Sequence, residues 1–222
     1  MDILRDLPKQ VKGFMDEEEG MRLYELAKEV STLGPCLEIG SYCGKSTIYL
    51  GQGCKQRDGI LFSIDHHRGS EEHQPGEEYH DPELFDPDYN NMDSFKTFRK
   101  TLDLASLEEV VVPIVAKSSV TARRWATPLG LVFIDGGHSF ESAFTDYSSW
   151  ASHVLAGGYL IIHDIFKNPQ EGGQAPYDIY KLALASGLFK EKPMVKTLGV
   201  LQKVKGEKIP GHVLKEIQKE KG

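Results

Sequence analysis

Residues 36–47 (CLEIGSYCGKST) constrain the fold more than any other stretch of the chain. The apolar residues up to Ile39 predict a short buried strand, Gly40 to Gly44 predict a tight turn, and the residues that follow predict a helix. Glycine allows the sharp bend and the close backbone approach that such a turn needs. A helix that begins behind the turn presents free N–H groups and the positive end of its dipole. The pattern favours a ligand pocket, although a plain strand-to-helix turn has the same residues.

The glycine spacing disfavours a pyrophosphate site. The stretch lacks the three-glycine spacing of a dinucleotide fingerprint, and Ile39 stands where a phosphate loop ending in Gly44-Lys45-Ser46 would have its first glycine. Glu38 would repel phosphates but would suit a ligand with an ammonium or sulfonium group. We therefore expect a nucleotide-type pocket with an acid beside the glycine turn.

The composition limits the partners and the compartment. The chain has 222 residues, a formal net charge of -7 and three cysteines. This length suits one large domain over residues 1–222, and the absence of a basic stripe predicts no nucleic-acid partner. Three cysteines cannot form a fully paired disulfide framework, which favours the reducing cytoplasm. The N-terminus has no apolar signal-peptide segment, and the apolar runs are too short to span a membrane.

Short apolar strands alternate with helical segments along the chain. We predict strands at 35–39, 60–65, 110–116, 131–135, 159–163 and 197–204. We predict helices at 16–30, 45–54, 93–103, 120–125, 140–154 and 177–186. Alternation of this kind indicates an α/β fold, a doubly wound, mostly parallel sheet with helices on both faces. A helical extension at 1–33 and a charged tail at 205–222 flank it.

Residues 68–92 interrupt this alternation. The segment is polar, rich in proline and glycine, and too long for an ordinary connection. It follows the second strand at the edge where ligands bind in open α/β sheets. We predict a lid or recognition loop with apolar anchors, and the alternative is a disordered acidic excursion. The predicted anchors are Tyr79, Leu84, Phe85 and Tyr89.

Acids stand at or next to the ends of four predicted strands. They are Glu38, Asp65, Asp135 and Asp164. In a parallel sheet they meet at one edge, and Asp65 has a spacing after the glycine turn that suits hydrogen bonds from ribose hydroxyls. A helix cap or a solvated turn acid is the alternative for Asp65.

Two histidines accompany the last two of these acids. Asp135 with His138, and His163 with Asp164, could hold a divalent cation or supply a general base. Local roles are the alternative, a turn cap for His138 and a satisfied strand-end histidine for His163. Loop histidines, such as His66 and those that follow it, are weaker candidates as ligands.

Several segments together resemble the Rossmann-like, S-adenosylmethionine-dependent methyltransferases, closest to the small-molecule group with O-methyltransferases of natural-product sugars. The matching segments are LEIGSYCGKST, LFSIDHH, VAKSS and LVFIDGGHSFESAFTDYSSWASHVLAGGYLIIHDIF. The resemblance covers residues 36–202 and implies a seven-stranded sheet. It implies transfer of a methyl group to a small-molecule acceptor and possible O-methylation. Separately, the N-terminal helix and the insertion could both build the contact of a homodimer, the commonest assembly.

The resemblance also implies roles for individual residues. The glycine turn would surround the methionine moiety of the cofactor, the ribose would lie at Asp65, and the adenine would lie beside Lys117. The full cofactor set is Glu38, Gly40, Ser41, Gly44, Ser46, Asp65, His66, Lys117, Ser118 and Asp135. The catalytic set is Asp135, His138, His163 and Asp164.

Metal-dependent relatives bind magnesium at the positions of Asp135 and Asp164. Here Gly137 replaces a frequent acid, and His163-Asp164 replaces adjacent acids. A magnesium or other divalent cation and a histidine base therefore remain competing mechanisms. A nicotinamide-dependent oxidoreductase and a non-catalytic S-adenosylmethionine- or nucleotide-binding protein are the rival functions.

Overall fold

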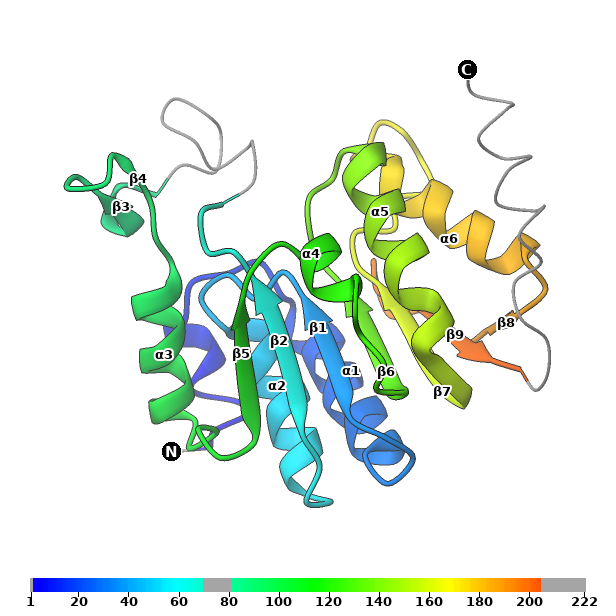
Figure 1. Cartoon of the computed structure of the whole chain (residues 1–222), viewed down its shortest axis with the longest axis horizontal. Coiled ribbons are helices and arrows are strands. Elements are labelled where there is room, and N and C mark those ends of the chain that lie inside the picture. Colours follow the sequence, from blue (N-terminus) through cyan, green and yellow to red (C-terminus); the bar gives the residue numbers. More distant parts are fainter. Residues whose placement is uncertain (1, 70–80, 205–222) are drawn as a thin grey trace.

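A seven-stranded sheet lies between two layers of helices in the computed structural model, which describes residues 2–69 and 81–204 (Figure 1). The strand order is β5-β2-β1-β6-β7-β9-β8. The strands are β1 (Cys36–Ile39), β2 (Leu61–Asp65), β5 (Val111–Val115), β6 (Leu129–Ile134), β7 (Val154–Ile162), β8 (Phe189–Glu191) and β9 (Gly199–Lys203). The helices are α1 (Glu17–Val30), α2 (Lys45–Lys55), α3 (Phe95–Leu104), α4 (Ser118–Ala122), α5 (Phe140–Trp150) and α6 (Ala175–Ala185).

The first five strands of that order run parallel and end level with one another. Ile39 at the end of β1 pairs with Ile64 of β2 and Ile134 of β6, and Ile134 pairs with Ile162 of β7. β9 is antiparallel to β7, and β8 is antiparallel to β9. The predicted doubly wound, mostly parallel α/β fold is confirmed, and its carboxyl ends form one edge.

The central strands bury both of their faces. Leu131 and Phe133 of β6 belong to the core cluster that contains α1, α2 and α3. Val132 and Ile134 belong to the cluster on the other face, with α5 and α6. Side chains alternate across a strand, so a central parallel strand needs an uninterrupted apolar run. Every residue of β6 is buried accordingly.

Two parts of the sheet differ from the sequence prediction. β7 begins at Val154, where the sequence predicts the end of a helix, and α5 already ends at Trp150 and is followed by a 3-10 turn (Ala151–His153). The pairing of β6 with β7 shifts register near Gly130, and a Cβ on Gly158 would lie 2.4 Å from the Gly130 carbonyl oxygen. Gly130 and Gly158 are therefore needed for close packing of the two strands.

β8 was not predicted at all. It has three residues, of which Phe189 is buried and the other two are exposed. So short an edge strand carries no alternating pattern that a sequence could reveal. Apart from the end of α5, the helix ends shift by at most three residues, as with α4, which was predicted at 120–125 and spans Ser118–Ala122.

The predicted insertion is described only from residue 81 onward. This part has a 3-10 turn (Pro82–Leu84) and a two-stranded hairpin, β3 (Phe85–Asp86) with β4 (Asn91–Met92). Leu84 is buried, as an anchor should be, whereas Tyr89 is 75% exposed. Tyr79 and the predicted tail at 205–222 lie outside the described residues.

The N-terminal residues share the main core. Leu7 and Met15 are buried in the same cluster as the strand residues of β1 and β6. Within residues 2–69 and 81–204, no helix combines the length and the apolar character that crossing a membrane requires.

Candidate functional site

The glycine turn after β1 touches the end of β6. Gly40 has φ +88°, and a Cβ placed on it would lie 2.0 Å from the Asp135 carbonyl oxygen. Gly44 has φ +92° and precedes the first residue of α2. Both positions therefore need glycine, one for close approach as well as conformation. The turn and Asp135 form one continuous wall at the carboxyl edge.

Asp65 ties this turn to the loop after β2. One carboxylate oxygen accepts a hydrogen bond from the Tyr42 N–H at 2.8 Å, and the other accepts from the His67 N–H at 2.7 Å. The side chain is half-buried. A carboxylate has about four acceptor positions, so these two bonds leave acceptor capacity for ligand hydroxyls.

Glu38 is enclosed beneath the turn. Its carboxylate is fully buried and accepts hydrogen bonds from the hydroxyls of Ser46 (2.5 Å), Thr47 (2.6 Å) and Ser63 (2.8 Å). Burial raises the pKa of Glu38 to about 7, while these hydrogen bonds act in the opposite direction. The hydrogen bonds of the Glu38 carboxylate, including the one from Ser46, thus connect β1 to β2 and to α2.

Ser41 has a different environment. Its side chain is 2% exposed, and its hydroxyl oxygen has no hydrogen-bond partner within the described residues. Buried polar atoms are nearly always satisfied. A molecule bound against the glycine turn would give this hydroxyl a partner.

The two histidines after β2 have unlike surroundings. His66 is half-buried, and its Nδ1 accepts from the Arg68 N–H at 3.1 Å. His67 is buried, and its Nδ1 lies 2.8 Å from the Ser94 hydroxyl. Burial lowers the pKa of His67. His67 therefore holds the start of α3, and His66 is the one nearer to solvent.

The loop after β5 carries Lys117, which is exposed, and Ser118, which is half-buried. The Ser118 hydroxyl donates to the Asp146 carboxylate, a partner that sequence reasoning missed. Burial raises the pKa of Asp146 to about 6, with the Ser118 hydrogen bond opposing the shift. A Cβ on Gly136 would lie 2.8 Å from an Asp146 oxygen. An acid on the buried stripe of α5 was the sequence signal for it.

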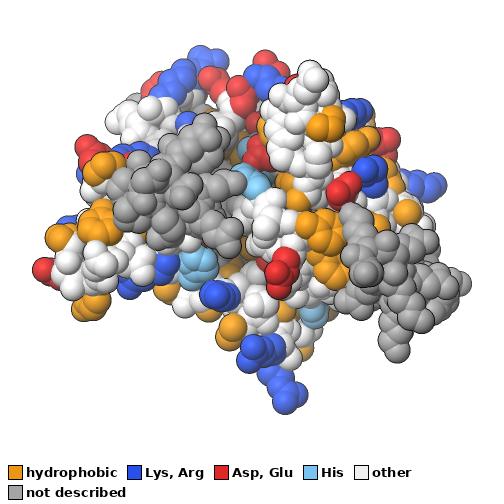
Figure 2. Space-filling model, turned by 90° about the horizontal axis from the view of Figure 1, so that it is seen from above, with side chains coloured by type: hydrophobic (Ala, Val, Ile, Leu, Met, Phe, Trp, Pro, Cys, Tyr) orange, Lys and Arg blue, Asp and Glu red, His pale blue; other side chains and the backbone are white. Residues whose placement is uncertain are grey.

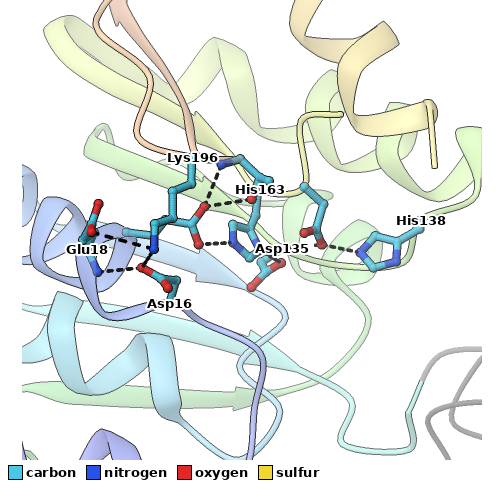
Figure 3. A network of polar contacts seen from close by, with 9 residues as sticks. Asp16, Glu18, Asp135, His138, His163 and Lys196 are labelled. Carbon is cyan, nitrogen blue, oxygen red and sulfur yellow. Dashed lines mark hydrogen bonds and ion pairs between the residues drawn. The ribbon is translucent and has the colours of Figure 1, made fainter. Parts of the chain in front are cut away.

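His163 lies between two carboxylates (Figure 3). Its Nδ1 is 3.0 Å from an Asp135 oxygen, and its Nε2 is 3.1 Å from a Glu19 oxygen. Burial alone would lower the pKa of this histidine, which is 5% exposed, but Asp135 and Glu19 together raise it to about 11. The ring is charged at neutral pH, and both its nitrogens are engaged. This arrangement does not favour the base role that the sequence suggested for His163, and Glu19 was not among the predicted residues.

Asp135, His138 and Asp164 form a second group beside His163. Each offers one ligand atom, and these atoms lie within 4.8 Å of one another. His138 Nε2 is 3.0 Å from an Asp164 oxygen, and Asp164 has φ +57°. Two carboxylates and an imidazole suit a divalent cation such as Mg²⁺, Mn²⁺ or Zn²⁺. The donor set therefore fits a metal, with His138 as a third ligand or as a base.

A cavity of about 10 Å³ adjoins this group, lined in part by Ile134, His138, Pro176 and Ile179. It has room for about one water molecule. In the view from above the carboxyl edge, histidine side chains are visible at the surface together with hydrophobic, acidic and basic side chains (Figure 2).

Comparison with known proteins agrees with this geometry. A family model described as a methyltransferase domain matches residues 37–165. An O-methyltransferase from Bacillus cereus in complex with SAH has a TM-score of 0.63 at 15% identity, over 92% of this chain and 91% of that chain.

Two further solved structures share the fold. The SAH-bound Podospora anserina methyltransferase PaMTH1 has a TM-score of 0.63 at 12% identity, over 92% of this chain and 89% of its own. The O-methyltransferase NovP has a TM-score of 0.62 at 16% identity, over 85% and 81%. The family match spans more than half of the sequence, and its strands carry the turn and the acids described above. The chain therefore belongs to the methyltransferase-domain family and is a Rossmann-like, S-adenosylmethionine-dependent methyltransferase.

Proposed function

We propose that this chain transfers a methyl group from S-adenosylmethionine to a hydroxyl of a small-molecule acceptor at the carboxyl edge of the sheet. One observation carries the proposal. The glycine turn at Gly40 is packed directly against Asp135, and Asp135 belongs to the cluster with His138 and Asp164. A donor bound at the turn would thus present its methyl group beside groups that can orient and deprotonate an acceptor.

The cofactor would occupy the turn and the ends of β2 and β5. The unsatisfied Ser41 hydroxyl and the backbone of Gly40 and Gly44 suit the amino-acid moiety. Asp65 has acceptor capacity left for ribose hydroxyls. Ser118 and exposed Lys117 would border the adenine. Glu38 would act from below, because its carboxylate holds the turn and not the ligand.

The reaction needs alignment and removal of one proton. The acceptor oxygen forms a bond to the methyl carbon while the carbon–sulfur bond breaks, which leaves a neutral thioether. The acceptor proton passes to His138, the exposed imidazole of the cluster, whose partner Asp164 stabilises the resulting charge. A divalent cation held by Asp135 and Asp164 would lower the pKa of the acceptor hydroxyl, and His138 then keeps its nitrogen for the proton.

A small acceptor agrees with the charge and with the relatives. The formal net charge of -7 provides no stripe for a nucleic-acid backbone. Two of the three compared structures of this fold are named as O-methyltransferases. The segment before α6, which follows Asp164 at the same edge, would contribute to the acceptor pocket.

Calorimetric titration with S-adenosylmethionine, with and without Mg²⁺, tests the proposal. Micromolar binding that weakens strongly in Asp65→Ala supports the cofactor site, and binding that Mg²⁺ strengthens supports the metal. Isotope-labelled cofactor with fractionated small-molecule extracts then reports turnover, which Asp135→Ala should abolish. Binding without turnover in any fraction would point to a non-catalytic cofactor-binding protein, and no binding would overturn the proposal.

A further inference from the structure

One side chain of the N-terminal helix reaches the catalytic edge, although α1 lies outside the residues that the family model matches. Glu19 is 3% exposed. One of its oxygens is 3.1 Å from His163 Nε2, and the other accepts hydrogen bonds from both the N–H and the hydroxyl of Thr197, each at 2.8 Å. Burying a charged carboxylate costs free energy unless partners compensate for it. The contacts to His163 and Thr197 supply that compensation, which indicates a specific role for Glu19.

The packing of α1 explains how Glu19 arrives there. A Cβ on Gly20 would lie 2.3 Å from the Tyr49 ring, and a Cβ on Gly53 would lie 2.4 Å from the Tyr24 carbonyl oxygen. The two glycines let α1 and α2 approach closely. Of the three acids in the first turn of α1, only Glu19 is buried. The helix is thus held at a depth that directs this one carboxylate to the sheet edge.

The loop before β9 fastens the same turn of α1 from outside. Lys196 Nζ is 2.7 Å from an oxygen of Asp16, the residue that caps α1, and it is 3.9 Å from Glu18 (Figure 3). The neighbouring Thr197 carbonyl accepts from the Ile165 N–H at 2.9 Å. Glu19 is therefore connected to the segment that follows β7 along two routes, through the ring of His163 and through Thr197 to Ile165.

These two routes enclose Asp164 and continue to Asp135. Asp164 has φ +57°, a conformation that persists only when its surroundings hold it, and its neighbours on both sides are the residues tied to Glu19. The other nitrogen of His163 lies 3.0 Å from Asp135. Resting on the function proposed above, we infer that Glu19 is a positioning residue, which fixes the side chain of Asp135 through His163 and the backbone of Asp164 through Thr197.

The test compares Glu19→Gln with a matched change on the same helix. Glu29 also joins α1 to β7, by accepting from the Tyr159 hydroxyl at 2.8 Å, but it lies away from the cluster. Glu19→Gln keeps the size of the side chain and removes its charge. Glu29→Gln controls for loss of a carboxylate between the same two elements.

The first readout is the NMR signal of the His163 ring protons in the purified full chain, assigned with a His163→Gln variant. Glu19→Gln should shift the Nδ1–H signal, which reports the Asp135 side of the ring, and Glu29→Gln should leave it in place. The second readout is Mn²⁺ affinity by electron paramagnetic resonance. Glu19→Gln should weaken it by about tenfold, as loss of an outer contact to metal ligands does, with S-adenosylmethionine affinity by calorimetry little changed.

An unchanged Nδ1–H signal and unchanged Mn²⁺ affinity, with only a lower thermal midpoint, would overturn the inference and make Glu19 an anchor of α1. Failure of the wild-type chain to bind S-adenosylmethionine would instead overturn the proposed function. Failure of the wild type to bind Mn²⁺ would remove the metal from that function. In both cases the ring-proton signal still decides the role of Glu19.

Discussion

Two buried ionisable groups at the same sheet edge are held in opposite ways. Glu38, under the glycine turn, is surrounded by three neutral hydroxyls from residues 8, 9 and 25 positions away. His163, beside the proposed catalytic cluster, is held by carboxylates 28 and 144 positions away. The surroundings of Glu38 are local and neutral, and those of His163 are distant in sequence and charged. This difference implies that substitutions and pH changes affect stability differently at Glu38 and at His163.

The largest expected effect comes from removing the charge at His163. His163→Leu would leave Glu19 and Asp135 facing each other without a cation, which costs about 3 to 5 kcal/mol of unfolding free energy. The same change at His67, which is buried but has a neutral hydroxyl as its partner, should cost about 1 to 2 kcal/mol. Urea unfolding of both variants measures the difference. Equal losses of unfolding free energy in the two variants would mean that the charges around His163 contribute no more to stability than the neutral partner of His67 does.

A pH series sharpens the comparison from the side of Glu38. The folded-state pKa of Glu38 is raised from 4.5 to about 7. Its contribution to stability is therefore fully present below the unfolded pKa and is lost as pH rises through about 7. As pH rises from the unfolded pKa of 4.5 to above the folded pKa of about 7, this group should lower the free energy of unfolding of the wild-type chain by about 3 kcal/mol.

Glu38→Gln cannot ionise and keeps an acceptor for the hydroxyls. Its unfolding free energy should therefore change less between pH 5 and pH 8 than that of the wild type. Parallel pH profiles of the two proteins would show that Glu38 is not responsible.

The contact between the glycine turn and Asp135 can be broken at Gly40. Gly40→Ala combines a positive φ with a Cβ that would lie 2.0 Å from the Asp135 carbonyl oxygen. Gly157→Ala has the same φ of +88°, with nothing within 4 Å of the added Cβ. We expect Gly40→Ala to cost about 2 kcal/mol more than Gly157→Ala and to lose S-adenosylmethionine binding. Thermal unfolding and calorimetry measure both, and equal behaviour of the two variants would show that the turn yields easily.

The smallest effect is expected at Ser118, which we propose to border the adenine. Ser118→Ala removes the hydroxyl that donates to Asp146 and should cost about 1 kcal/mol above pH 7, where Asp146 is ionised. It should also raise the pKa of Asp146 further, because that hydrogen bond lowers it. Thr121→Ala, in the same short helix, removes only a 3.4 Å contact to a carbonyl and serves as the control in urea unfolding. A loss no greater than the control would contradict the role given to Ser118.

The sequence predicted most of the sheet because the central strands are uninterrupted apolar runs. β6, with all of its residues buried, is the clearest of them. The short edge strand β8 and the early start of β7 were missed, because one has a single buried residue and the other begins among glycines. An apolar sequence pattern reveals an element that buries a whole face. These two segments form strands because they pair with neighbouring strands, which leaves no such pattern in their own sequence.

The acids at the strand ends were predictable for a related reason. Parallel strands bring their carboxyl ends to one edge, so Asp135 and Asp164 had to be neighbours. Glu19 could not be found in this way, because it is one of three consecutive glutamates that look like a favourable first helical turn. Its partners, His163 and Thr197, lie 144 and 178 residues away in the sequence.

The bond between Glu19 and Thr197 also sets the order in which the site is completed during synthesis. Glu19 leaves the ribosome with the first helix, and the donors that bind its second oxygen follow only with the last strand of the sheet. A chain is synthesised from its N-terminus, and its segments can fold as they become available. A nascent chain that already contains the glycine turn and all the acids at the strand ends therefore still lacks the contact between Glu19 and Thr197, and the carboxyl edge is complete only when these two distant parts of the domain meet.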